Sequence, residues 1–96
     1  MENNIINLQF DKDVSGLAGN EYGYEQYKKQ LLGKFDMNKN NIIVFPEQIQ
    51  KIAISFIQGL FGEILEKIDK NNIEKYITIK TSSERLTEKV VNNIKF

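Results

Sequence analysis

The chain has 96 residues, 41% of them hydrophobic, and its 13 basic and 13 acidic residues leave a formal net charge of +0. This length supports a single domain over residues 1–96 with one hydrophobic core, and not two independent cores. A neutral chain lacks the basic surface that supplies most nucleic-acid affinity and the polybasic character of membrane-surface helices, so we expect neither partner.

The residue types also limit the chemistry. The sequence contains no Cys, which excludes disulfides and thiolate catalysis, and no His, which removes the commonest general base and metal ligand. No base is paired with a nucleophile, so we expect no enzyme, cofactor or metal. The first residues lack the basic and apolar regions of a secretory signal, and the most apolar run, residues 52–65, is too short to span a bilayer. We therefore expect a cytoplasmic protein.

The first third of the chain predicts a strand, a loop and a helix. Residues 5–10 alternate between apolar and polar side chains, which predicts a strand with one buried face. The glycine-rich residues 11–23 predict a loop, either a flexible connector or a partner-binding loop, because their spacing matches neither phosphate-binding motif. From Tyr24 the apolar residues recur every three or four positions, which predicts an amphipathic helix that ends near Gly33.

A second strand follows. Residues 36–41 are polar and predict a turn, whereas residues 42–45 are continuously apolar, which is typical of a strand buried on both faces. Pro46 has no N–H to donate and ends this strand. Residues 47–54 are compatible with a connector or with one helical turn.

The central helix is predicted over residues 55–69. Ser55 and Gln58 have the spacing of a capping box, in which each side chain binds the backbone N–H of the other residue. Gly59 and Gly62 are unfavourable in an exposed helix interior, so we expect them to bring the helix close to a neighbouring backbone, such as that of the sheet. The expected buried stripe consists of Phe56, Leu60, Ile64 and Ile68.

The last part of the chain completes an alternating pattern. A turn at residues 69–72 leads to a strand at residues 76–79, and Ser82 or Ser83 can cap a final helix. The apolar positions of that helix are Leu86, Val90 and Ile94. The pattern predicts an α/β fold with a small, mainly parallel or mixed sheet of three to four strands. Because such a sheet is narrow, a homodimer could cover one of its edges.

Three segments resemble a known family. Ile42-Ile43-Val44-Phe45 is followed by Ile54-Ser55-Phe56, and then by Leu60-Phe61-Gly62 in the next helix. This succession of buried strand, serine with Phe, and glycine-containing helix resembles the STAS-like domain family of unknown function, which is distantly related to the anti-sigma-factor antagonist (STAS) domains. The resemblance covers roughly residues 5–79.

The resemblance implies a small cytosolic regulator without cofactors that docks onto a protein partner, with a histidine-kinase-like ATPase as the expected partner. It also implies that Ser55 is a phosphoacceptor, whereas an ordinary N-cap explains the same serine without modification. A phage or defence-system protein that binds and inhibits another protein is the alternative.

Residues that would contact the partner lie on the glycine-rich loop, at the start of the first helix and on the central helix. These candidates are Gly19, Asn20, Tyr22, Tyr24 and Gln58. Four carboxylates near the loop lack the ligand spacing of an EF-hand, so a solvated acidic loop is expected there and not a cation site. They are Asp11, Asp13, Glu21 and Glu25.

Overall fold

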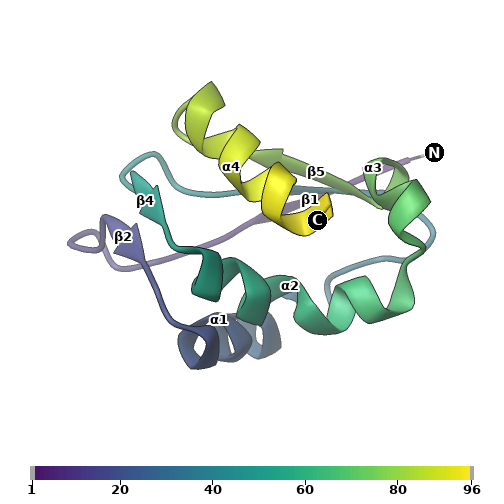
Figure 1. Ribbon diagram of the computed structural model, residues 1–96, viewed down its shortest axis with the longest axis horizontal. Helices are drawn as coiled ribbons and strands as arrows, with labels where there is room; N and C mark the ends of the chain where they lie inside the picture. Colours follow the sequence, from purple (N-terminus) through teal and green to yellow (C-terminus); the bar gives the residue numbers. More distant parts are fainter. Residues whose placement is uncertain (1, 96) are drawn as a thin grey trace.

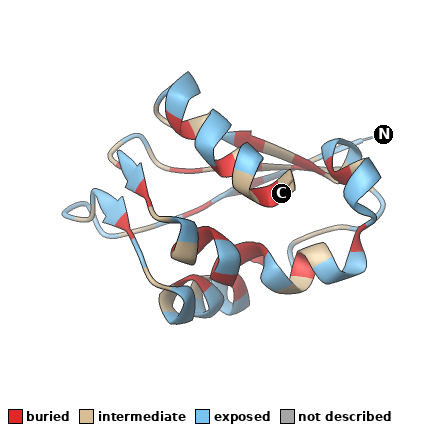
Figure 2. Cartoon of the chain, viewed as in Figure 1, coloured by how far each residue is buried: buried red, intermediate tan, exposed pale blue. Residues whose placement is uncertain are grey.

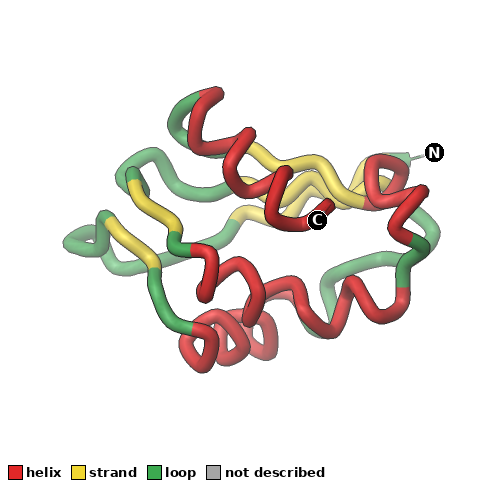
Figure 3. Tube along the Cα trace, viewed as in Figure 1, coloured by secondary structure: helices red, strands yellow, loops and turns green. Residues whose placement is uncertain are grey.

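The computed structural model describes residues 2–95, so Met1 and Phe96 lie outside the described residues. Three parallel strands form the main sheet in the order β1 (Asn3–Asn7), β3 (Asn40–Val44) and β5 (Ile77–Lys80) (Figure 1). Two short parallel strands, β2 (Gly16–Leu17) and β4 (Lys51–Ile52), pair with each other beside it (Figure 3).

Helices alternate with these strands along the chain, which confirms the predicted α/β fold with a small parallel sheet. A π-helical segment, η1, directly continues α1, and a 3-10 turn, η2, directly precedes α3. The helical elements are α1 (Asn20–Gln26), η1 (Tyr27–Leu31), α2 (Ile54–Lys67), η2 (Lys70–Asn72), α3 (Ile73–Tyr76) and α4 (Glu84–Lys95).

One face of the main sheet carries the core, and the other is open. Ile6 and Ile43 face the helices and are buried, as is Ile79 on β5. On the opposite face Ile5 is 62% exposed, and its cross-strand neighbour Ile42 is half-buried. Figure 2 shows buried and exposed residues alternating along the helices. The expectation that residues 42–45 are buried on both faces is therefore wrong, because within residues 2–95 no helix covers that second face.

The helices α1 and α2 cross with their backbones in contact. A Cβ on Gly59 would overlap the carbonyl oxygen of Asn20 and lie 2.9 Å from the backbone nitrogen of Tyr24. A Cβ on Gly23 would likewise overlap the carbonyl oxygen of Phe56. The predicted close approach is confirmed at Gly59, although the neighbour is α1 and not the sheet.

The prediction fails at Gly62. No other group lies within 4 Å of the position that a Cβ would take there, and the residue is exposed. Gly62 therefore lies on the solvent side of α2 and makes no close backbone contact.

The expected loop at residues 11–23 is wrong in part, because it contains β2 and the first turn of α1. Two residues are too few to show the period of a strand, so the sequence gives no signal for β2. Gly19, at φ 100°, separates β2 from α1, and the helix begins at Asn20 instead of Tyr24. The ambiguous residues 47–54 likewise contain β4.

The buried stripes of the two longest helices are confirmed. Phe56, Leu60, Ile64 and Ile68 are all buried, and so are Leu86, Val90 and Ile94. Ser83 caps α4, since its Oγ accepts a hydrogen bond of 3.2 Å from the N–H of Leu86.

Asn41 is a fully buried polar residue that connects three parts of the fold. Its Oδ1 accepts hydrogen bonds of 2.8 Å from the side chain of Asn4 and from the N–H of Asp36. Its Nδ2 lies 3.0 Å from the carbonyl oxygen of Tyr76 and 2.9 Å from that of Asp36. The residues before β3, the strand β1 and the end of α3 are thus tied to one side chain.

The chain just beyond β1 is paired with a side chain. The N–H of Gln9 donates to Oε1 of Gln30 at 2.7 Å, and Nε2 of Gln30 donates to the carbonyl oxygen of Gln9 at 2.9 Å. A single amide on η1 therefore satisfies both backbone groups of Gln9.

Candidate functional site

Ser55, the predicted phosphoacceptor, lies in the first turn of α2 but does not cap it. The helix begins at Ile54 with Ala53 as its N-cap residue, and no side chain satisfies the cap position. The predicted capping box of Ser55 and Gln58 is therefore wrong. The Oγ of Ser55 accepts a hydrogen bond of 3.0 Å from the N–H of Gly19, so the serine ties the start of α2 to the residue before α1.

The predicted contact residues gather around the crossing of α1 and α2. Asn20 and Tyr24 are exposed on α1, and their backbones contact Gly59. Gln58 is exposed on α2 and precedes Gly59, and half-buried Gly19 binds Ser55. The structure thus brings together residues from both helices at one place.

Tyr22 is half-buried and packs against the core. Its ring centroid lies 5.5 Å from that of Phe56 and 6.5 Å from that of Phe10. Tyr22 also lines a polar hollow of about 480 Å³ beside the end of β1. Tyr22 therefore has a structural role in the aromatic cluster as well as an accessible side.

Tyr24 belongs to a surface cluster with three other side chains. Its ring stacks on that of Tyr27 at 6.0 Å, and the Nζ of Lys28 lies 4.8 Å above it. The Glu63 carboxylate on α2 raises the pKa of Tyr24, because hydrogen bonding to the neutral hydroxyl and the negative charge of the carboxylate both disfavour the phenolate. Burial raises the pKa of Tyr27, and Glu63 adds to this rise. We use the name Tyr24 patch for the accessible members of this cluster, Tyr24, Lys28 and Glu63, together with exposed Gln58 on the same helix as Glu63.

The acidic residues form no cation site in the described part of the chain. Among residues 2–95, no three His, Cys, Asp or Glu side chains lie close enough to hold a metal ion. In the same range, no helix combines the length and the apolar character required to cross a membrane.

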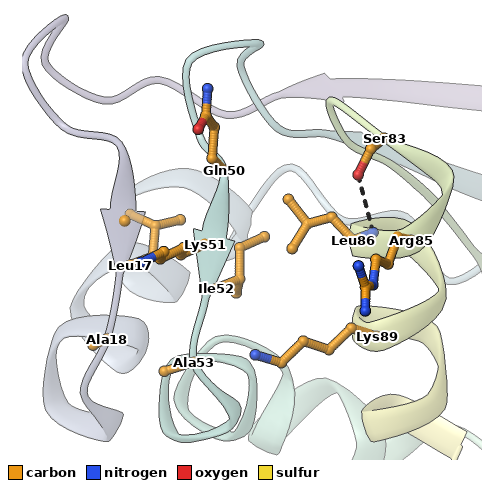
Figure 4. Close-up of a pocket in the computed structure, with 11 residues that line it drawn as sticks. Leu17, Ala18, Gln50, Lys51, Ile52, Ala53, Ser83, Arg85, Leu86 and Lys89 are labelled. Atoms are coloured by element: carbon orange, nitrogen blue, oxygen red, sulfur yellow. Dashed lines mark hydrogen bonds between the residues drawn. The ribbon is translucent and has the colours of Figure 1, made fainter.

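A groove that no sequence pattern indicated lies between β4 and α4. It encloses about 630 Å³, and Ile52 and Leu86 approach each other across its floor (Figure 4). Three cationic side chains border it: Lys51 on β4, and Arg85 and Lys89 on α4. The spacing of Arg85 and Lys89 places them on one side of a helix, but nothing in the sequence connects that pair to Lys51.

Comparison with known proteins gives no relative: no protein-family model, no curated protein and no solved structure matches the chain.

Proposed function

We propose that this protein is a small regulatory domain that docks a partner protein through the Tyr24 patch. The main support is the arrangement of α1 and α2, whose backbones touch at Gly23 and Gly59. Because this contact leaves little freedom for sliding, the two helices form a rigid base. A partner that binds it loses little conformational entropy from the domain itself.

The chemistry of the patch suits a protein interface. Tyrosine is enriched among the residues that dominate binding energy, because it combines a large apolar ring with a hydroxyl group. Tyr24 is 38% exposed although its ring is held by Tyr27 and Lys28. Its orientation is therefore set before binding.

We further propose that phosphorylation of Ser55 regulates this docking. Its Oγ forms the contact with the N–H of Gly19, next to Asn20 at the start of α1. A phosphate there would add a charge of about −2 and three acceptor oxygens, and would replace the short contact between the two helix starts. The expected partner, a histidine-kinase-like ATPase, rests on the sequence resemblance alone.

The test is an affinity purification from the native host with four variants, read by quantitative mass spectrometry. Tyr24→Ser should reduce recovery of the partner at least about tenfold, the effect of losing one strong contact residue. Lys70→Ser, a change at an exposed residue on η2, is the control and should retain it. Equal recovery with both variants would contradict docking at the Tyr24 patch.

Two substitutions at Ser55 separate regulation from packing. Ser55→Ala removes the hydrogen bond to Gly19 without adding charge, and Ser55→Asp adds a carboxylate at the same position. Loss of the partner with Ser55→Asp alone supports the switch. Loss with both variants would instead mean that the Ser55–Gly19 contact is structural.

A further inference from the structure

The groove between β4 and α4 has an apolar floor. Leu17, Ile52 and Leu86 are at least 93% buried and close its base. Ala18 and Ala53 form the end nearest α1 and α2, where their small side chains leave the groove open (Figure 4). A hollow of about 630 Å³ with such a lining falls in the size range of pockets that hold small organic ligands.

All the charge that borders the groove is positive. Lys51, Arg85 and Lys89 line it, and no acidic residue does. Within the described residues 2–95, none of these three cations takes part in an ion pair. Because the whole chain has a net charge of +0, the excess of positive charge belongs to the groove and not to the protein as a whole.

The acidic and basic residues at the start of α4 line different hollows. Glu84 and Glu88 line a different hollow, beside the end of β5, whereas Arg85 and Lys89 line the groove. Like charges four residues apart destabilise a helix, and a cation in the first turn opposes the helix dipole. Glu88 lies three residues after Arg85, a spacing that allows an ion pair, yet among residues 2–95 Arg85 forms none. The guanidinium therefore remains available for an anion in the groove.

We propose that this groove binds a small amphipathic organic anion, with an alkyl or aromatic body on Ile52 and Leu86 and a carboxylate at Arg85 and Lys89. The planar guanidinium can donate two parallel hydrogen bonds to a carboxylate, and the ammonium of Lys89 adds a second charge. Figure 4 shows Lys89 extending from α4 toward β4, beside Arg85. This site is separate from the Tyr24 patch, and the inference does not depend on the docking function.

The test compares two probes that share one alkyl chain, decanoate and decyltrimethylammonium, by amide NMR shifts and titration calorimetry. Decanoate should shift the amide signals of Leu17, Ile52 and Leu86, and the cationic probe should not. The double variant Arg85→Gln, Lys89→Gln should weaken decanoate binding by at least about tenfold.

Two further variants make the result specific. Lys70→Gln, Lys75→Gln removes the same amount of charge from exposed lysines outside the groove and should leave binding unchanged. Ala18→Leu fills the groove from an exposed position and should abolish binding even if the Arg85 and Lys89 variant folds poorly. Urea unfolding checks that each variant is folded.

Three outcomes would overturn the proposal. The first is equal binding of the two probes. The second is an equal loss of decanoate affinity in the control variant Lys70→Gln, Lys75→Gln and in the groove variant Arg85→Gln, Lys89→Gln. The third is that an acidic, apolar peptide occupies the groove while decanoate does not, which would make it a peptide-docking site.

Discussion

The contact between α1 and α2 predicts opposite effects for the same substitution at two positions of one helix. Gly59→Ala places a methyl group against the α1 backbone, where it would overlap the Asn20 carbonyl oxygen and lie 2.9 Å from the nitrogen of Tyr24. Gly62→Ala places the methyl group in open space. Both changes improve helix propensity by about 1 kcal/mol, so the difference between them isolates the helix contact.

The magnitude follows from the geometry. Ordinary van der Waals contacts of a Cβ begin at 3.4 Å, so the nitrogen of Tyr24 must retreat by about 0.5 Å and the carbonyl of Asn20 by more. Overpacking of this kind costs about 1–3 kcal/mol, and a backbone cannot turn aside as a flexible side chain can. We expect Gly59→Ala to lower the free energy of unfolding by about 2 kcal/mol and Gly62→Ala to raise it by about 0.5–1 kcal/mol.

Urea unfolding followed by circular dichroism measures both values. The unfolding free energies of the two variants should differ by about 2.5–3 kcal/mol, and at about 4–8 °C per kcal/mol for a domain of this size the melting temperatures should differ by about 10–24 °C. Unfolding free energies that agree within about 0.5 kcal/mol, the usual range of surface substitutions, would refute the close crossing of α1 and α2. A fall in the m value with Gly59→Ala would indicate that α1 had detached from the fold.

Three other substitutions test separate features. Asn41→Ala removes the buried amide between β1, β3 and α3 and should cost about 2–3 kcal/mol in urea unfolding, since the N–H of Asp36 and several carbonyls lose their partner. Ser83→Ala removes the cap of α4 and should cost about 1 kcal/mol in the same assay. Glu63→Gln should let Tyr24 ionise at lower pH, measured by phenolate absorbance, because the carboxylate raises its pKa. In the unchanged protein, the stability that comes from this raised pKa is fully present below pH 10.0, the ordinary tyrosine pKa. It is lost as the pH rises through the raised pKa of Tyr24.

The elements that the sequence predicted best are those with a long apolar period. The stripes of α2 and α4 repeat over three or four turns, so each position is supported by several others. A serine cap at Ser82 or Ser83 was predictable because the stripe begins three or four residues later, and the structure places the cap at Ser83. In contrast, β2 and β4 have two residues each, and only their pairing with each other defines them.

The two glycines of α2 show where sequence patterns stop. Gly59 and Gly62 lie three residues apart in the same helix, and helix propensity assigns both the same unfavourable free energy relative to alanine. The difference arises because α1 crosses at Gly59 and not at Gly62. The start of α2 was also misplaced: the spacing of Ser55 and Gln58 puts the N-cap at Ser55, whereas the N-cap is Ala53, two residues earlier.

The groove was not predictable for a similar reason. Lys51 belongs to β4 and Arg85 to α4, and the two elements meet only in the folded chain. The open face of the sheet was also unexpected. Continuous apolar residues in β3 indicate burial on both sides, but the helices cover one side alone among the described residues.

The pairing of Gln30 with Gln9 bears on aggregation. A strand that joined the edge of β1 from another molecule would need the N–H and carbonyl of Gln9, and the Gln30 amide already occupies both. Such a strand could not extend past Asn7 without breaking two hydrogen bonds. Gln30→Ala would uncover those groups, and fibril growth in stored protein would then be expected to start at this edge.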